Sequence, residues 1–435
     1  MKRYFTRTET LAIIKPRNPL FKTIDELSFK AKNVYNSALY ICRQSYFEYK
    51  TIIGYTVLHS MHKGQYLEDY KSLPIQTTQQ ILKVVCKNMK AFSVSTKDYY
   101  NNPHKYKAKP KIPKYKHKTK GRFTLYFTNQ QVKFKEGFIV FPKITGINPI
   151  KTRLDLSIDR ENQMFSNSIE SPIRHVRIVP LLNSYRIELV YDKAIDVPDT
   201  SKNQNLASID LGINNFSTVV TYGPKTSRPL ILNGKGLKSY NKHFNKKLAN
   251  LKSKAKKVNN KHTTKAIQRL ISKRNRVYRD FNHKASRAIV NYLLQNEVKC
   301  LIIGYNKQWK TNSNLSKKVN QTFIQIGYLE FIKLLTYKAQ EVGIKVFTVT
   351  EEYTSGTSFL DGEQPTKEYY NKSRRIHRGL FLTNVHRPIN ADINAAYQIL
   401  SKATNNKAVY NQKYTPKESF IPTKLSLDTF KRKIA

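Results

Sequence analysis

From residue 205 onward, short strand-like apolar runs alternate with helical segments, and this alternation restricts the fold more than any other feature. Three consecutive strands are predicted by the runs LASID, FSTVVTY and RPLILN, and two more by KCLIIG and IKVFTVT. Helical patterns over 323–342 and 391–401 are expected to pack on them. Strands interleaved with helices predict an α/β layer with a mixed sheet.

Three carboxylates stand at the ends of these predicted elements. Asp210 ends the LASID run before Gly212, Glu351 follows the IKVFTVT run, and Asp392 opens the last helix. Phosphodiester cleavage can use two Mg²⁺ ions ~3.5–4 Å apart, bridged by carboxylates, and Mg²⁺ prefers oxygen ligands. Taken singly, a strand-end turn at Asp210 or a helix cap at Asn390 or Asp392 is the simpler interpretation. Their combination favours a metal-dependent nuclease site with Asp210 as the bridging ligand.

Charge and cysteine content restrict the class of partner. The chain has 78 Lys and Arg residues against 29 Asp and Glu, a formal net charge of +49 over 435 residues. A net charge of magnitude ~2–8 is enough to keep a small domain soluble. The surplus therefore favours nucleic acid, since each basic residue on a phosphate releases counterions. The three cysteines form no CxxC pair, so we expect a reducing compartment, and we expect no signal peptide or membrane span.

Two segments concentrate the positive charge. Residues 103–120 hold eight lysines, three prolines and two tyrosines, a pattern that suits an extended segment whose lysines follow phosphates while rings stack on bases. A solvated linker is the alternative interpretation. Residues 235–280 predict two long helices with an apolar stripe and a basic face. The predicted nucleic-acid contacts are Lys105, Tyr106, Lys107, Lys109, Lys111, Lys114, Tyr115, Lys246, Lys247, Lys256 and Lys257.

The first half of the chain predicts a strand, helices and then a β-rich part. Residues 4–16 alternate as a first strand. A capping box formed by Thr23 and Glu26 predicts the start of a helix, and a second helix is expected from near Pro74. Residues 121–195 then switch to period two between turn residues, which predicts a β-barrel or sheet.

Four ordered sequence blocks carry a family resemblance, namely IDLGINNFSTV, IIGYNKQWKTNSNLSKKVNQTFIQIGY, VTEEYTSGTSFLDGE and RRIHRGLF…INADINAAYQI. They closely resemble TnpB, the transposon-encoded RNA-guided endonuclease also called OrfB transposase, which is related to type V CRISPR effectors and to Fanzor proteins. The resemblance implies a multidomain α+β fold. The implied parts are a wedge-like β-barrel over 1–22 and 103–204, an inserted helical recognition unit over 23–102, an RNase H-like (RuvC) α/β nuclease domain with a mixed sheet over 205–405, a lid or degenerate ribbon insert over 353–389, and a basic flexible tail over 406–435.

The resemblance also implies an activity and its partners. We expect an RNA-guided, Mg²⁺-dependent endonuclease of a transposable element, with Mn²⁺ able to substitute, that cuts double-stranded target DNA beside a short motif read by the protein. A guide RNA from its own locus is the expected partner. A nuclease-inactive guided repressor and a DNA strand-transfer transposase are the alternatives. The expected location is the cytoplasm, with the nucleoid, or the nucleus in a eukaryotic or viral source; the oligomeric state is not predicted.

The chain departs from the TnpB pattern at the second catalytic position. Most TnpB proteins carry a Glu at the end of the strand that here reads KCLIIGYN, where this chain has Gly304. A subset of relatives resembles this chain in carrying a Glu on the following strand, a role that Glu351 fits. Adjacent strands lie ~4.8 Å apart, so a Glu side chain spans that distance. Glu352 is the alternative ligand, because a shift of one residue reverses the face.

The second departure is the usual zinc ribbon of the family. Residues 353–389 contain no cysteine, and His377 and His386 alone cannot complete a tetrahedral structural site. We therefore expect no zinc. The basic cluster of Arg374, Arg375 and Arg378 is predicted to contact nucleic acid, with a surface basic loop as the alternative.

Overall fold

The computed structural model divides into two compact units, Tyr4–Ala194 and Ile195–Ala435, the latter together with Met1–Arg3. None of the helices within the described residues is both long and apolar enough to cross a bilayer. The described residues are 2–135, 137–151, 157–159, 164–166, 173–196, 205–260, 262–306, 325–377 and 379–427.

The Tyr4–Ala194 unit combines helices with short antiparallel sheets. Its helices are α1 (Leu20–Tyr49), α2 (Tyr55–Gln65), α3 (Leu67–Lys71) and α4 (Ile75–Asn101), with short 3₁₀ turns η1 (Pro103–Lys105) and η2 (Lys143–Thr145). Its strands are β1 (Lys2–Ile14), β2 (Leu125–Thr128), β3 (Lys133–Lys135), β4 (Phe138–Val140), β5 (Ile150–Lys151), β6 (Ser157–Asp159), β7 (Met164–Ser166), β8 (Ile173–Pro180) and β9 (Tyr185–Asp196).

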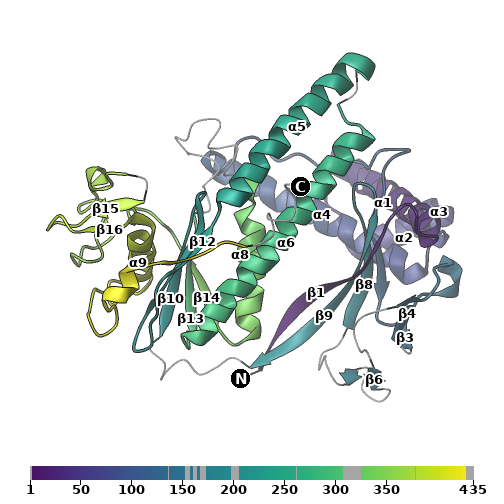
Figure 1. The fold of residues 1–435 in the computed structure, drawn as a ribbon. Coiled ribbons are helices and arrows are strands. Elements are labelled where there is room, and N and C mark those ends of the chain that lie inside the picture. Colours follow the sequence, from purple (N-terminus) through teal and green to yellow (C-terminus); the bar gives the residue numbers. More distant parts are fainter. Residues whose placement is uncertain are drawn as a thin grey trace. The chain divides into compact units, whose positions relative to one another are not determined.

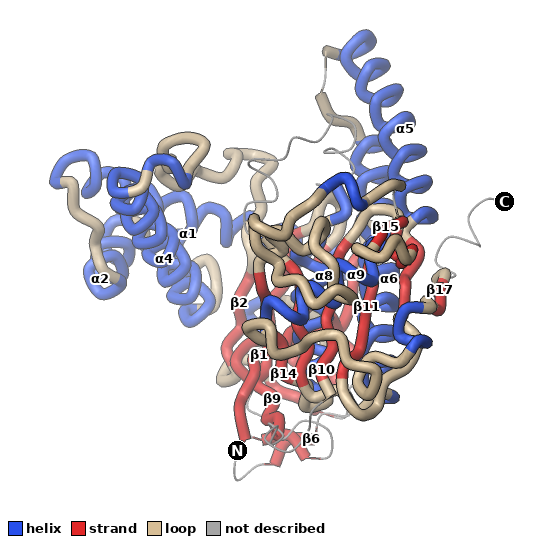
Figure 2. The backbone as a smooth tube through the Cα atoms, turned by 90° about the vertical axis from the view of Figure 1, so that its left-hand side faces the viewer, coloured by secondary structure: helices blue, strands red, loops and turns tan. Residues whose placement is uncertain are grey.

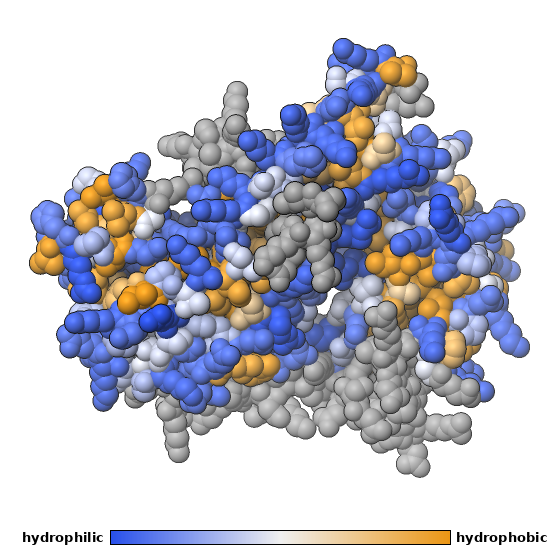
Figure 3. Space-filling view, viewed as in Figure 1, coloured by the Kyte–Doolittle hydropathy of each residue, from blue (hydrophilic) through white to orange (hydrophobic). Residues whose placement is uncertain are grey.

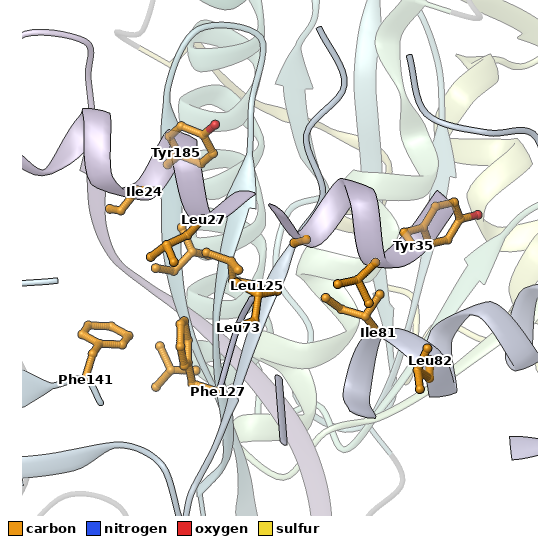
Figure 4. Packing of buried hydrophobic residues seen from close by; sticks show 14 of the residues in the cluster. Ile24, Leu27, Tyr35, Leu73, Ile81, Leu82, Leu125, Phe127, Phe141 and Tyr185 are labelled. Carbon is orange, nitrogen blue, oxygen red and sulfur yellow. The ribbon is translucent and has the colours of Figure 1, made fainter. Parts of the chain in front are cut away.

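These strands form three separate sheets in the described residues, ordered β1-β9-β8-β2, β3-β4-β5 and β6-β7. The sheet prediction for 121–195 is confirmed, whereas a closed barrel is not. One hydrophobic core joins the helices to the largest sheet. Leu27 of α1, Ile81 of α4 and Phe127 of β2 are among its buried side chains (Figure 4).

The start of α1 corrects one sequence prediction. The helix begins at Leu20 after Pro19, and the side-chain oxygen of Asn18 accepts a hydrogen bond from the Leu20 amide at 2.9 Å. Thr23 therefore lies inside the first turn, and the predicted capping box is wrong because Asn18 and Pro19 already start the helix. The second predicted helix is confirmed, since α4 begins directly after Pro74.

A six-stranded mixed sheet organises the second unit, in the order β14-β13-β10-β11-β12-β17. Strands β10, β13 and β14 run parallel, while β11 is antiparallel to both β10 and β12. The mixed sheet and its five predicted strands are confirmed. The strands are β10 (Leu206–Leu211), β11 (Asn215–Tyr222), β12 (Leu230–Asn233), β13 (Cys300–Gly304), β14 (Lys345–Val349) and β17 (Thr423–Leu425).

Helices cover both faces of this sheet (Figure 1). They are α5 (Lys235–Asn259), α6 (Lys265–Gln295), α8 (Tyr328–Glu341) and α9 (Ala391–Ala403). Ala207, Ile209 and Leu211 of β10 pack in the core formed with α6 and α8. Ser208 lies on the opposite face, where its hydroxyl donates to the carbonyl of Ala396 in α9 at 2.6 Å. Side chains alternate along a strand, so Asp210 shares the face that α9 covers.

The predicted pair of long basic helices is present as α5 and α6. Thr264 caps α6 by accepting a hydrogen bond from the Ile267 amide at 3.3 Å. Apolar residues such as Phe244 and Ala255 are buried along α5, while its lysines are exposed. Figure 1 shows α5 extending past the end of the sheet, and hydrophilic side chains predominate along it in Figure 3.

The prediction of a flexible tail over 406–435 is wrong for its first part. The structure describes residues 406–427, in which η4 (Lys417–Phe420) precedes β17, and β17 pairs with β12 at the margin of the sheet (Figure 2). The Phe420 ring packs against Tyr397 of α9, with the centroids 5.4 Å apart. Apolar contacts and edge pairing therefore order this segment. Residues 428–435 lie outside the described residues.

Candidate active site

The carboxyl ends of the three parallel strands bring two of the predicted carboxylates to one edge of the sheet. In the β10–β13 pair, Ile209 lies opposite Ile303, so Asp210 and Gly304 are the next residues of the two strands. Gly304 in turn lies opposite Val349 of β14, and Glu351 follows two residues later. Open α/β sheets bind their ligands outside the carboxyl ends of the strands. The arrangement therefore places Asp210 and Glu351 where a ligand is expected.

The side chain of Glu351 occupies the space directly over Gly304. A Cβ atom added to Gly304 would lie 2.5 Å from Glu351 Oε1, 2.8 Å from Glu351 Cγ and 2.6 Å from Ile399 Cδ1 of α9. The Glu351 amide donates to the side-chain oxygen of Asn306 at 2.9 Å, which fixes the backbone at this point. Glu351 thus fills the volume that any side chain at position 304 would need.

Glu352, the alternative ligand, lies in a different environment. Its side chain is exposed, and its carbonyl accepts a hydrogen bond from Lys402 at 3.1 Å. The structure therefore brings Glu351, and not Glu352, to the position over Gly304.

Asp392 stands in the first turn of α9, and Asn390 is the cap of that helix. The Asn390 side-chain oxygen accepts from the amides of Asp392 and Ile393 at 3.0 and 3.2 Å. The Asp392 carboxylate makes other contacts: Oδ2 accepts from Asn215 at 2.7 Å and Oδ1 accepts from Arg375 at 3.2 Å. Because Asn390 does the capping, that interpretation of Asp392 is wrong.

Electrostatics show that the carboxylates affect one another. Burial raises the pKa of Asp210 to about 7, with a second contribution from the charge of Asp392, while Arg375 acts in the opposite direction. Burial also raises the pKa of Tyr328, and the charges of Asp210 and Glu351 add to this shift. The Tyr328 hydroxyl donates to the carbonyl of Gly212 at 2.7 Å, and Gly212 follows Asp210 by two residues. The site therefore concentrates negative charge, which Arg375 offsets only in part.

The chemistry of this site suits a hard divalent cation. All three side chains offer only oxygen donors, the ligand type of Mg²⁺, and a bound cation would offset the repulsion that raises the pKa of Asp210. Within the described residues, however, no group of three or more His, Cys, Asp or Glu side chains is arranged to hold a metal ion. The carboxylates fit Mg²⁺ by chemistry, but they do not form a closed ligand group in this structure.

Arg374, predicted to contact nucleic acid, is engaged inside the 353–389 insert. Its guanidinium donates to both Glu363 oxygens at 2.7 and 2.9 Å and to Asp361 at 2.6 Å. Only 11% of its side chain is exposed. Arg375 contacts Asp392 instead, and Arg378 lies outside the described residues. The insert also contains η3 (Lys372–Arg374) and the strand pair β15 (Leu380–Leu382) and β16 (Pro388–Asn390).

The other predicted nucleic-acid contacts fall into two groups, one in each unit. One group lies in the Tyr4–Ala194 unit, where Tyr106 donates to Asp98 at 2.6 Å and Tyr115 is exposed. The lysines of both groups are exposed at Lys105, Lys107, Lys109, Lys111, Lys114, Lys246, Lys247, Lys256 and Lys257.

Sequence reasoning did not identify three residues beside the carboxylates, namely Asn215, Asn306 and Tyr328. Asn215 lies within the IDLGINNF block, so its position shortly after Asp210 was a usable signal. Asn306 stands just after a strand pattern and Tyr328 lies within the predicted helix 323–342, and nothing in their spacing connects them to the site.

Comparison with known proteins identifies two family domains, the first of which begins within the Tyr4–Ala194 unit. Residues 184–310 match the OrfB_IS605 family, described as a probable transposase, and residues 328–399 match the Cas12f1-like TNB domain. A CRISPR-associated endodeoxyribonuclease, Cas12f2, from a Micrarchaeota archaeon is 35% identical over 133 residues, covering 29% of this chain and 24% of the relative. The chain therefore spans about a quarter of that curated relative's length.

Solved structures of similar proteins include two effector complexes. A Cas12f1–sgRNA–target DNA complex is 15% identical and covers 90% of this chain and 98% of its own, with a TM-score of 0.34. CasPhi-2 (Cas12j) bound to crRNA is 9% identical and covers 94% and 99%, with a TM-score of 0.44. The relation to TnpB-type transposases and type V effectors is confirmed by the matches over residues 184–310 and 328–399.

Proposed function

We propose that this chain is an RNA-guided, Mg²⁺-dependent DNA endonuclease of a transposable element, with a RuvC-like nuclease domain in the second unit. The observation that carries the proposal is the Glu351 side chain in the space over Gly304. It supplies a carboxylate at the strand end where the TnpB pattern expects one, on the face that also presents Asp210. The loss of the usual Glu is thereby compensated within the sheet.

Asp210, Glu351 and Asp392 would hold the metal, with Mg²⁺ preferred and Mn²⁺ able to replace it. A metal bound there would supply activation of the attacking water and stabilisation of the charge on the phosphate. The chain's own residues orient the ligands: Asn215 and Arg375 hold the two oxygens of Asp392, and Asn306 fixes the backbone of Glu351. Asp210, with its raised pKa, would release its proton when a cation binds.

Guidance by RNA is supported by the family matches and by the charge of the chain. The curated relative is named as a CRISPR-associated endodeoxyribonuclease, and the net charge of +49 suits binding to both an RNA and a DNA duplex. In this proposal a guide RNA from the same locus pairs with one strand of the double-stranded target, and the protein reads a short motif beside it.

The test is cleavage of a matched double-stranded target by protein co-purified with RNA from its own locus, in Mg²⁺, Mn²⁺ or EDTA. Loss of a neighbour of a metal ligand typically costs 10–100-fold in activity, so we expect Glu351→Ala, which removes a ligand, to reduce the cleavage rate by at least ~100-fold. Glu352→Ala is the matched control and should cut normally. Target binding by the variants should be unchanged.

The relocation itself is tested by returning the carboxylate to its usual strand. The double variant Gly304→Glu/Glu351→Gly should recover part of the activity that Glu351→Ala loses, because both side chains occupy the same volume. Guided target binding without cutting by the wild type would instead identify a nuclease-inactive repressor. Joining of DNA strands without RNA would identify a strand-transfer transposase.

A further inference from the structure

An extended basic segment, residues 106–120, is fastened along α1 in the Tyr4–Ala194 unit; we call it the strap. Lys32 donates to the carbonyl of Lys118 at 2.8 Å, and Asn36 both donates to the carbonyl and accepts from the amide of Lys116, at 2.9 and 2.8 Å. Three helical turns along α1 from Lys32, Arg43 donates a hydrogen bond to the carbonyl of Pro113 at 3.0 Å.

These contacts hold the backbone of the strap and leave its cationic groups exposed. Lys32, Asn36 and Arg43 share one face of α1, because they are spaced by four and seven residues. Each binds a main-chain group of the strap. The exposed lysines of the strap are Lys107, Lys109, Lys111, Lys114, Lys116, Lys118 and Lys120.

The strap lysines have no carboxylate partner among the described residues. An ion pair just before the strap joins Lys105 and Asp98 at 3.8 Å, and another just after it joins Arg122 and Asp25 at 2.6 Å. Neighbouring like charges repel, and an unanchored chain of this composition would sample many conformations. Fastening the strap to α1 therefore keeps a row of positive charge in place, which lowers the ordering cost of binding a polyanion.

Exposed aromatic rings lie beside this row of charge. Tyr115, in the strap, is 43% exposed, with the Arg43 guanidinium 4.8 Å from its ring centroid. Tyr40 stands on the strap-binding face of α1, four residues after Asn36, and is 46% exposed. Tyr100 of α4 accepts a hydrogen bond from Lys109 at 2.5 Å. Solvent-exposed rings of this kind are available for stacking on unpaired bases, which contributes to binding free energy.

We propose that the strap and the rings of Tyr40, Tyr100 and Tyr115 bind a single-stranded segment of nucleic acid, with the lysines on phosphates and the rings on bases. A duplex would use the charges alone, since its bases are already stacked and paired, whereas single strands use both. This proposal deepens the proposed function by giving the non-nuclease unit a partner. It does not depend on cleavage.

The test measures binding of the full-length chain to a labelled 20-nucleotide oligouridylate, to the matching oligothymidylate and to a 20-base-pair duplex, across a salt series. The strap variant replaces Lys107, Lys109, Lys111, Lys114 and Lys118 with Gln. Its control variant replaces an equal number of exposed lysines elsewhere in the same unit, namely Lys63, Lys71, Lys87, Lys90 and Lys97. The two variants have the same net charge.

We expect the strap variant to lower the slope of log affinity against log salt by ~0.7 for each lysine that contacts a phosphate. The control variant should change it much less. Tyr40→Ala and Tyr115→Ala should each weaken single-strand binding by ~5- to 150-fold and leave duplex binding unchanged. Asn36→Ala removes two strap contacts without changing charge, and it should also weaken single-strand binding.

Equal losses in the strap and control variants would overturn the proposal in favour of general attraction by a basic protein. Equal effects of the tyrosine variants on single strand and duplex would overturn the stacking part. The oligouridylate and oligothymidylate arms distinguish RNA from DNA as the source of the strand. A background of Glu351→Ala separates this result from the nuclease proposal, because that variant should bind normally whether or not the wild type cuts.

Discussion

Two carboxylate clusters in the Ile195–Ala435 unit differ in how fully basic side chains balance their negative charge. In the insert, Asp361 and Glu363 share one guanidinium, that of Arg374, and all three side chains are largely buried. At the strand ends, burial and, to a smaller extent, the charge of Asp392 raise the pKa of Asp210, and the nearby Arg375 offsets this only in part. Proximity of acids is thus not a functional signal by itself. A buried acid whose pKa is raised, as at Asp210, is the stronger indication of a ligand site.

The neutralised cluster has a structural role within the described part of the insert. Glu363 accepts from the Ser358 amide at 2.7 Å, and Asp361 accepts from the Asn384 amide at 2.8 Å. The carbonyl of Glu363 accepts from Gln398 of α9 at 3.0 Å. These ion pairs and hydrogen bonds therefore connect the loops of the insert, which contains no cysteine, to each other. The hydrogen bond from Gln398 also connects the insert to α9, the helix that carries Asp392.

The largest expected effect tests this network. Arg374→Met should lower the free energy of unfolding by about 3–5 kcal/mol, because it leaves two buried carboxylates without their counter-charge. Urea unfolding at pH 7 measures the change. Arg375→Met is the matched control and should cost much less, since its single contact with Asp392 is longer and its side chain is 32% exposed. Equal losses for the two variants would contradict the contrast between the clusters.

A smaller effect is expected at the strand ends, where Glu351 is tightly packed against Gly304. Gly304→Ala would put a methyl group within 2.5–2.8 Å of Glu351 and Ile399, and overpacking of this kind costs about 1–3 kcal/mol. Cleavage should fall as well, because Glu351 has to move. The control is Gly64→Ala in α2, where nothing lies within 4 Å and the helix gains roughly 0.5–1 kcal/mol. Unchanged stability and cleavage in Gly304→Ala would contradict the assigned position of Glu351.

The sequence was sufficient to predict the sheet and the residues at its strand ends. Five apolar runs with strand length predicted β10 to β14, and parallel pairing of three of them follows from the helices between them. The strand pattern therefore predicted that Asp210 and Glu351 lie at the same edge of the sheet. The choice between Asn390 and Asp392 as the cap could not be made, because both residue types favour that position.

Long-range polar contacts were beyond sequence reasoning. The pairing of Arg374 with Asp361 and Glu363 depends on the path of an irregular loop. Its sequence has no hydrophobic periodicity from which that path could be predicted. The strap is similar: its composition predicted an extended basic segment, but nothing indicated that Asn36 and Arg43 hold it. β17 is only three residues long, and its pairing with β12 brings together segments almost two hundred residues apart, so the tail was predicted to be flexible.

The smallest expected effect is a pH dependence of stability that comes from Asp210 at the strand ends. The pKa of Asp210 is about 7 in the folded chain against 3.8 for an ordinary Asp. Between these values the folded state holds a proton that the unfolded state has lost, so stability decreases as pH rises from about 4 to 7. Asp210 is not fully buried as a residue, so solvent screens its repulsion from Asp392. We therefore expect a loss on the order of 1 kcal/mol.

Urea unfolding of the metal-free protein in EDTA, from pH 4.5 to 7.5, measures this loss, with Asp210→Asn as the control that cannot ionise. The wild type should lose stability relative to the variant as pH rises, and saturating Mg²⁺ should reduce the difference, because the cation takes the place of the proton. The same slope in wild type and Asp210→Asn would mean that Asp210 is already neutralised within the protein. The two clusters would then be alike, and the reason for placing a metal at the strand ends would be lost.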